Sequence, residues 1–206
     1  MTRYNRRVPK IVDPEDRRLA LANAAIRIIS TVGLDGVRLR DVAAEAGWTT
    51  GALTHYFPDK RALLIMALQV SLDQRQRLLD TLPAEGDELR ALLEQALPLD
   101  EERLRHWRVS QAFSVQSWSD PELTAIQRKA YRGWRRRIVN LVAKGVADGR
   151  LREDLDPEET ADEMIAIVDG VALQALFDPD RWPPEKQRAF LDRFLTRISR
   201  QDRREP

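Results

Sequence analysis

Apolar residues recur along this chain at the three- and four-residue spacing of helices that bury one face. Ala22, Ile26 and Ile29 show the pattern in the first such segment, and later segments repeat it. Sustained alternation of β-branched and polar residues is missing, as is any Asn-Gly turn that would join two strands. The pattern therefore predicts an all-α fold.

Capping residues, prolines and glycines mark the ends of the expected helices. Asp13 and Asp156 each precede a proline, which fits an N-cap followed by the first helical position. Gly33 and Gly47 are expected to end helices, because glycine adopts the backbone angles of a terminating turn. Nine helices are predicted, over residues 14–33, 39–46, 50–56, 59–79, 88–97, 101–117, 121–149, 157–177 and 184–200.

Composition disfavours several classes of protein. The 206 residues are 43% hydrophobic and contain no cysteine, so a core is feasible while disulfides and thiolate metal sites are excluded. The two histidines lack partners at metal-ligand spacing, and no phosphate loop, nucleophile elbow or paired-carboxylate motif indicates an enzyme or a cofactor. Apolar runs are too short for a secretion signal or a membrane span, so a cytoplasmic protein is expected.

Residues 38–57 have the layout of a helix-turn-helix. Two short predicted helices flank a turn that contains Gly47, which is expected at positive φ. Thr49 stands where the second helix needs an N-cap, and Leu53 and Phe57 face inward. The charge distribution is compatible with DNA binding by the N-terminal part. Residues 1–60 carry 10 Lys/Arg and 7 Asp/Glu, a positive excess, whereas the remainder carries 24 Lys/Arg and 26 Asp/Glu, a negative excess. This motif predicts DNA binding, although a glycine turn between helices is by itself a weak signal.

A longer ordered pattern is more specific, and it resembles the TetR family of bacterial repressors over residues 14–64. The elements of the pattern are Gly33-x-x-Gly36, Arg40-Asp41-Val42-Ala43, Ala46-Gly47, Gly51-x-Leu53, His55-Tyr56-Phe57 and Lys60-x-x-Leu63.

The resemblance implies which residues meet DNA. It assigns a recognition surface that enters the major groove, phosphate contacts from Tyr56 and Lys60, and contacts to phosphate or a base from Arg38 and Arg40. His55 has a second interpretation, as a histidine at the edge of the core. The matching positions of the recognition surface are Thr49, Thr50, Gly51, Ala52, Thr54 and His55.

Three positions depart from the family pattern. Arg38 replaces the commoner Thr or Ser cap of its helix, and Thr54 replaces the commoner tyrosine. Trp48 replaces a small aliphatic residue, and either packs on the first helix or stacks over the DNA backbone. A basic arm precedes the first helix, and is either a solvated tail or a minor-groove contact. Its cationic residues are Arg3, Arg6, Arg7 and Lys10.

The second half of the chain is similar to the C-terminal domain of the TetR subgroup that includes the choline-responsive repressor of betaine synthesis. The residues that carry this similarity are Trp107, Phe113, Trp118-x-Asp120-Pro121-x-Leu123, Tyr131-x-x-Trp134-Arg135 and Asp169-Gly170. The similarity implies a regulatory domain, but it transfers no ligand. The expected organisation is thus a flexible basic arm over 1–12, a helix-turn-helix domain over 13–60, a regulatory and dimerisation domain over 61–201 and a tail over 202–206.

Aromatic residues of this second half suggest an effector pocket, with ordinary core as the alternative. An aromatic cage for a cation is conceivable, but nearby arginines make the neighbourhood basic. The candidate pocket residues are Trp107, Gln111, Phe113, Gln116, Trp118, Tyr131 and Trp134.

The last two predicted helices carry apolar stripes that suggest a four-helix dimer contact, with burial inside one subunit as the alternative. The stripe residues are Ile165, Val168, Ala172, Ala175, Leu176, Phe190, Leu191, Phe194 and Ile198.

Together these features predict a ligand-responsive regulator that binds a palindromic operator in double-stranded DNA as a homodimer. A repressor released by a small-molecule effector is expected. Two alternatives stay open: a transcriptional activator, and a helical ligand-binding or interaction protein that does not bind DNA.

Overall fold

The computed structural model describes residues 13–81 and 87–200. The expected basic arm over 1–12 and the tail over 202–206 lie outside the described residues. The described residues form nine α-helices, and their β structure is limited to an isolated antiparallel bridge between Leu151 and Ser199. The expectation of an all-α fold is therefore confirmed.

The helices follow the expected boundaries closely. The fifth and the seventh helix each end two residues before the expected position, at Gln95 and Ala147. The bounds are α1 Pro14–Val32, α2 Leu39–Glu45, α3 Thr50–Tyr56, α4 Lys60–Asp80, α5 Glu88–Gln95, α6 Glu101–Ser117, α7 Pro121–Ala147, α8 Pro157–Phe177 and α9 Pro184–Ile198.

Local chemistry explains these boundaries. Asp13 caps α1 by accepting a hydrogen bond from the backbone N–H of Glu15, and Asp156 caps α8 in the same way. Gly33 ends α1 at φ +69°. A Cβ on Gly36 would lie 2.6 Å from the carbonyl oxygen of Val32, so the turn after α1 has no room for a side chain.

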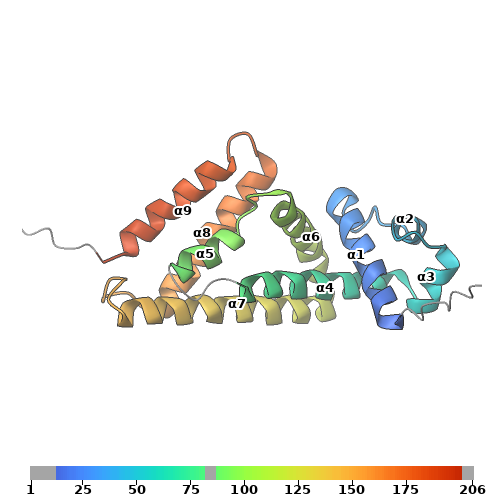
Figure 1. Ribbon diagram of the computed structural model, residues 1–206, viewed down its shortest axis with the longest axis horizontal. Helices are drawn as coiled ribbons and strands as arrows, with labels where there is room; N and C mark the ends of the chain where they lie inside the picture. The colour runs from blue at the N-terminus through green and yellow to red at the C-terminus, as the bar shows by residue number, and fades with distance from the viewer. Residues whose placement is uncertain (1–12, 82–86, 201–206) are drawn as a thin grey trace, which may run out of the picture.

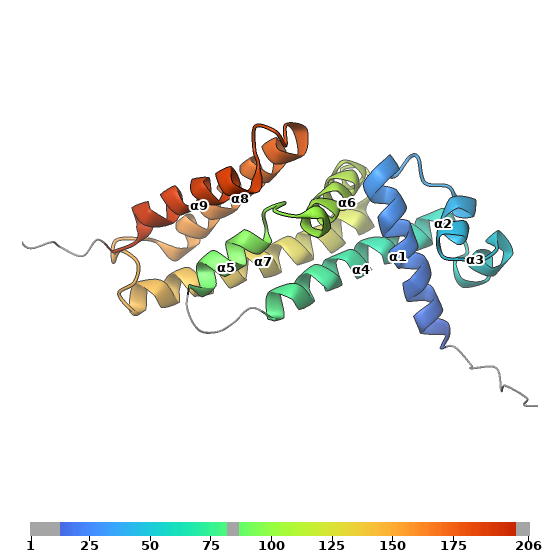
Figure 2. The same ribbon diagram turned by 45° about the horizontal axis from the view of Figure 1, so that its top comes forward.

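The molecule is elongated, with α1, α2 and α3 at one end (Figure 1). We call these three helices the head. Two long helices, α4 and α7, run side by side away from the head, and α8 and α9 lie toward the other end (Figure 1, Figure 2). Because α4 follows α3 directly and continues into the second half, it connects the head to the helices of the second half.

Two apolar clusters hold these parts together. One joins the head to α4 and α6, with Phe57 and Phe113 among its fully buried side chains. Residues on both sides of the expected domain boundary at position 60 share this cluster, since it includes Leu63 of α4. The other cluster joins α5, α7, α8 and α9 around Ile138 and Met164.

The apolar stripes of α8 and α9 face their own chain. Leu176 and Phe190 are half-buried, and the seven other stripe residues are at most 5% exposed. These seven side chains have almost no exposed surface, which favours the alternative of burial inside one subunit. These seven residues are Ile165, Val168, Ala172, Ala175, Leu191, Phe194 and Ile198.

Candidate nucleic-acid interface and effector cavity

The turn between α2 and α3 sets the direction of the recognition helix. Gly47 has φ +75°, the positive value expected of it. The hydroxyl oxygen of Thr49 accepts a hydrogen bond from the N–H of Ala52 at 3.2 Å, which confirms Thr49 as the N-cap. Leu53 and Phe57 are buried on the inner side. The opposite side of α3 is consequently left to solvent.

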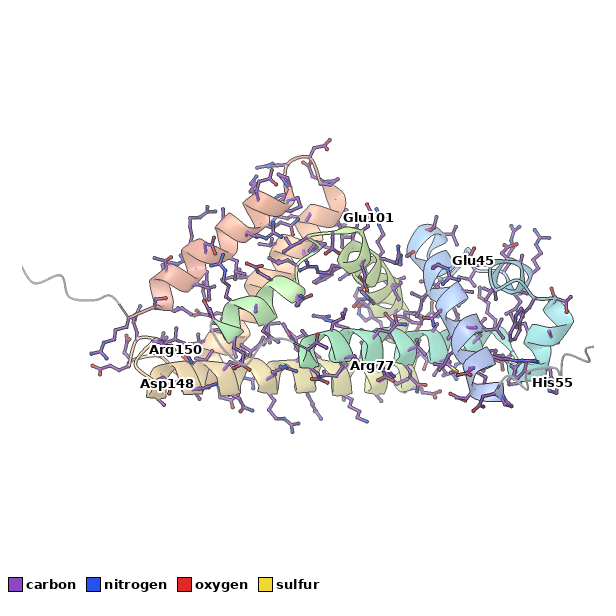
Figure 3. All side chains as sticks on the ribbon, viewed as in Figure 1. Glu45, His55, Arg77, Glu101, Asp148 and Arg150 are labelled. Carbon is purple, nitrogen blue, oxygen red and sulfur yellow. The ribbon has the colours of Figure 1, made fainter. Side chains whose placement is uncertain are left out.

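Most of the residues assigned to DNA contact lie on this outer side or beside it. Figure 3 places His55 at the outer end of the head, and the exposed ring is not part of the core edge. Ala52, Tyr56 and Lys60 are half-buried. The exposed members are Arg38, Arg40, Thr49, Thr50, Gly51, Thr54 and His55.

Tyr56 joins the recognition helix to α1. Its hydroxyl oxygen accepts a hydrogen bond from Arg17 Nη1 at 3.1 Å, and its ring lies 5.9 Å from the ring of Trp48. The guanidinium of Arg17 also lies over Trp48, at 5.5 Å from the ring centroid. Trp48 therefore packs toward the first helix in the DNA-free protein, and Tyr56 has a structural contact besides its implied contact with DNA.

Lys60 and Arg38 occupy the start of α4 and of α2. The ammonium of Lys60 donates to the carbonyl oxygen of Leu34 at 3.1 Å, which braces the turn after α1. An ammonium has three N–H donors, so two remain for a phosphate. Arg38 is the N-cap residue of α2 but makes no side-chain capping bond, in line with the loss of the usual hydroxyl at this position.

The aromatic residues expected to form a pocket are dispersed. Trp107 is buried, with its indole N–H donating to the carbonyl oxygen of Ala96 at 2.7 Å. Phe113 faces the cluster shared with the head, because six residues along a helix turn it to a different side. Trp118 and Tyr131 are 86% and 50% exposed. The described part of the chain therefore does not bring these four aromatic side chains around one cavity.

The remaining candidates do not gather around one cavity either. Gln111 is half-buried and Gln116 is exposed. Trp134 is half-buried, and the guanidinium of Arg75 lies over its ring at 5.2 Å from the ring centroid. Of the seven candidates, only Trp107 lines a cavity described below.

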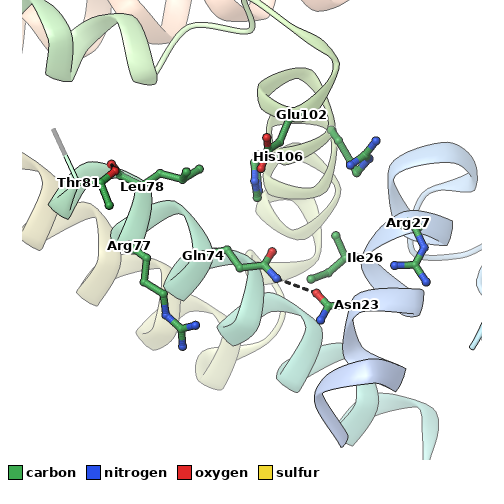
Figure 4. A pocket seen from close by; sticks show the side chains of 10 residues that line it. Asn23, Ile26, Arg27, Gln74, Arg77, Leu78, Thr81, Glu102 and His106 are labelled. Atoms are coloured by element: carbon green, nitrogen blue, oxygen red, sulfur yellow. Dashed lines mark hydrogen bonds between the residues drawn. The ribbon is translucent and has the colours of Figure 1, made fainter. Parts of the chain in front are cut away.

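A cavity of about 440 Å³ lies between α1, α4 and α6 (Figure 4). Asn23 of α1 and Gln74 of α4 are joined across it by a hydrogen bond of 2.7 Å. We call this space the outer cleft. It is lined by Asn23, Ile26, Arg27, Gln74, Arg77, Leu78, Thr81, Glu102, Arg105 and His106.

A smaller cavity adjoins the outer cleft, and we call it the inner cavity. Leu78 and His106 line both spaces and form the wall between them. The inner cavity is lined by Arg75, Leu78, Leu79, Gln95, Arg103, His106, Trp107 and Ser110. Trp107 apart, sequence patterns did not indicate these residues, because they are ordinary positions of several helices that meet only in the folded chain.

Burial changes the ionisation of groups at the two spaces. It lowers the pKa of His106, an effect opposed by Glu102 and supported by Arg75, and the His106 Nδ1 lies 3.4 Å from the hydroxyl oxygen of Ser71. Burial also lowers the pKa of Arg75, while the charge of Asp169 opposes that shift. Within the described ranges, no three side chains of the metal-binding types gather as a metal site.

Two family comparisons cover most of the chain. Residues 21–67 match the bacterial regulatory proteins of the tetR family, and residues 85–200 match the C-terminal domain of BetI-type transcriptional repressors. In residues 13–81 and 87–200, every helix is too short or too polar to cross a bilayer.

Individual relatives match along nearly their whole length. The chain is 31% identical over 205 residues to the HTH-type transcriptional regulator PksA of Bacillus subtilis, covering 96% of this chain and 97% of PksA. It is 26% identical over 189 residues to the nicotine-responsive repressor HdnoR of Paenarthrobacter nicotinovorans, covering 89% and 96%.

A solved structure extends this similarity to three dimensions. A transcriptional regulator from Saccharomonospora viridis, crystallised in complex with choline, superposes with a TM-score of 0.81 at 27% identity, over 92% of this chain and all of that one. Together with the exposed recognition helix of the head, these matches establish the family. The chain belongs to the TetR family of DNA-binding transcriptional regulators, which are not enzymes, and its C-terminal domain is of the BetI type.

Proposed function

We propose that the protein is a dimeric repressor that binds a palindromic operator and is released by a small-molecule effector. The observation that carries this proposal is the exposed polar side of α3, which Thr49 and the Arg17–Tyr56 bond fix in place. A cavity that reaches α1 supports control by an effector, because α1 is the helix to which Tyr56 is bound.

Different residues of the head serve affinity and specificity. Thr50, Thr54 and His55 present hydroxyl and imidazole groups that suit base edges, and the methyl of Ala52 suits a thymine methyl. Phosphates are met by cations beside the recognition helix, which add affinity without reading sequence. The proposed phosphate-binding residues are the cations Arg38, Arg40 and Lys60, together with the hydroxyl of Tyr56.

The outward side of α8 is the proposed dimer contact. Ala166, Gly170, Leu173 and Phe177 follow one another at spacings of four, three and four residues, which places them on one side of the helix. Leu173 is 40% exposed and Phe177 is 80% exposed. No atom would lie within 4 Å of a Cβ on Gly170, so a second helix can approach closely here.

The occupant we propose for this side of α8 is a second copy of the chain. One recognition helix offers few base contacts, whereas two related by a two-fold axis read half-sites about 34–36 Å apart. An effector then acts by favouring a conformation in which the two heads no longer match that spacing.

A gel-shift titration with the DNA upstream of the protein's own gene tests the proposal. We expect a sequence-specific, salt-sensitive shift that the double variant T50A/T54A abolishes. Thr196→Ala is the matched control, because Thr196 is likewise exposed and its hydroxyl likewise donates to a carbonyl of its own helix. Absence of a specific shift would refute the repressor and leave a helical interaction protein, and activation of a reporter gene would identify an activator.

A further inference from the structure

The charge around the two adjoining spaces is strongly one-sided. Among their lining residues, the acidic group is Glu102 alone, which faces five arginines. Such an excess of positive charge in a recess raises the local concentration of anions. The five arginines are Arg27, Arg75, Arg77, Arg103 and Arg105.

Among the described residues, two of the five arginines are in ion pairs, whereas the exposed Arg77 and Arg105 and the half-buried Arg75 are not. Arg103 binds Asp100 at 2.8 Å and Arg27 binds Glu45 at 2.5 Å. Within residues 13–81 and 87–200, Arg75 makes neither an ion pair nor a hydrogen bond through its guanidinium, and Asp169 acts on it only from a distance. Its remaining contact is the face of Trp134, at 5.2 Å.

This arrangement leaves a desolvated cation without a counter-ion. Arg75 is half-buried, and burial lowers the pKa of its guanidinium, so the charged form loses part of its hydration at this position. A guanidinium remains protonated in proteins, so it gains free energy when an anion enters. His106 adds no positive charge at neutral pH, because burial lowers the pKa of its imidazole as well.

Apolar side chains beside these cations suit the body of an organic ligand. Leu78, at 36% exposure, lies in both linings, Ile26 lines the outer cleft and Trp107 lines the inner cavity. The outer cleft has a volume typical of small-molecule sites, whereas the inner cavity, at about 20 Å³, has room for little more than one water-sized group such as a carboxylate oxygen. Figure 4 shows Leu78 on α4 and His106 on α6, on opposite sides of the space between these two helices.

We propose that the outer cleft and the inner cavity together form an effector site for an organic anion, whose apolar body contacts Leu78 and Ile26 and whose carboxylate pairs with Arg75. The proposal rests on the proposed function, to which it adds the place and the chemical class of the effector. An organic cation such as choline would meet the like charge of Arg75, which lies over the face of Trp134.

The site is placed to influence the head. Asn23 and Ile26 belong to α1, and the Asn23–Gln74 hydrogen bond crosses the outer cleft from α1 to α4. A ligand that enters between these helices competes with that bond and displaces α1. Because Arg17 of the same helix holds Tyr56, such a displacement reaches the recognition helix.

Isothermal titration calorimetry on the full-length protein, without DNA, tests the anion site. The probes are octanoate, benzoate and indole-3-acetate, each compared with its uncharged amide, and choline. We expect at least one carboxylate to bind, its amide to bind at least tenfold more weakly, and choline to give no binding. Failure of all three carboxylates, equal binding of acid and amide, or preference for choline would overturn the proposal.

Variants locate the site for the carboxylate that binds. Arg75→Gln is expected to weaken binding of that carboxylate at least tenfold, and Arg75→Lys to weaken it less. Leu78→Trp is expected to block binding, because the larger side chain fills the space beside the wall. Arg132→Gln, at an exposed arginine of α7, is the matched control and keeps wild-type affinity. Wild-type affinity in R75Q would overturn the assignment.

Two further measurements keep the test independent of folding and of operator binding. The melting temperature of ligand-free R75Q is expected to equal or exceed that of the wild type, because an uncompensated charge has been removed. In a gel shift, R75Q is expected to bind the operator normally but to resist release by the carboxylate. If the wild type fails to shift DNA, the repressor proposal fails while calorimetry still decides the anion site.

Discussion

Arg61, at the second position of α4, binds both carboxylate oxygens of Asp120, which is the N-cap of α7. Arg61 Nη2 lies 3.0 Å from Oδ1 and 2.9 Å from Oδ2, and Nε lies 3.2 Å from Oδ2. The same carboxylate accepts hydrogen bonds from the backbone N–H groups of Glu122 and Leu123. One side chain thus starts a regulatory helix and ties it to the helix that follows the recognition helix.

Substitution of Asp120 is expected to separate these two roles. Asp120→Ala removes the cap and the ion pair with Arg61, and Asp120→Asn keeps a capping oxygen. Arg61→Ala keeps the cap but removes the ion pairs with Asp120 and Glu122. Urea unfolding should therefore give the largest loss of midpoint for D120A and small losses for D120N and R61A. Equal losses for all three would contradict a separate capping role.

Stability is expected to depend on pH through His106. Burial, opposed by Glu102, lowers its pKa in the folded state, whereas an unfolded histidine titrates near about 6.5. Because His106 protonates more easily in the unfolded chain, the folded state is most stable above the pKa of the unfolded histidine. This stability is lost as the pH falls from that pKa through the lower pKa of the folded state. His106→Gln should therefore flatten the urea midpoint between about pH 7 and pH 5. The exposed control His55→Gln should keep the wild-type slope, and a wild-type slope in H106Q would contradict this origin.

DNA affinity is expected to depend on Arg40 through a phosphate contact. Arg40 is 69% exposed along its side chain and lies beside the recognition helix on α2. Arg40→Ala should reduce the slope of log affinity against log salt by about 0.9, since one phosphate contact is lost. Arg132→Ala, at an exposed arginine far along α7, should leave the slope unchanged. An unchanged slope for R40A would show that the arginine does not meet a phosphate.

Dimer formation is expected to require Phe177. The described residues include two aromatic side chains with most of their surface exposed, Trp118 at 86% and Phe177 at 80%. Phe177→Asp places a charge in the proposed contact and should give a monomer in analytical ultracentrifugation. Trp118→Asp is the matched control, because it introduces the same charge at an equally exposed aromatic outside α8. A dimeric F177D protein would exclude this side of α8 as the contact.

Phe113 is expected to act as a core residue that joins the head to α6. It is fully buried in the cluster shared with α1 and α4. Phe113→Ala should lower the free energy of unfolding by about 3–5 kcal/mol, because a large side chain is replaced by a cavity. Trp118→Ala, at an exposed aromatic nearby in sequence, should change it by less than about 0.5 kcal/mol. A small effect of F113A would indicate that the site tolerates truncation and is not a packed core.

The helix-turn-helix could be predicted in detail because its determinants are local. A glycine at positive φ, a threonine at an N-cap and two apolar residues four apart act within a few residues of chain. Gly47, Thr49, Leu53 and Phe57 are therefore found as expected. The additional contacts of Tyr56 and Lys60 could not be predicted in this way, since their partners Arg17 and Leu34 lie far from them in sequence.

The sequence by itself determined the nine helices, their caps and the family of this protein, because helical periodicity and capping depend on neighbours along the chain. Only the tertiary structure decided which side of each helix is covered. Trp107 and Phe113 are both buried, yet Phe113 belongs to the cluster shared with the head while Trp107 lines the inner cavity. The stripe of α8 through Val168 turns inward while Phe177 stays outside. Burial depends on non-local packing, as does the meeting of Asn23 with Gln74 across the outer cleft. The residues of the proposed effector site likewise come together only in the folded chain.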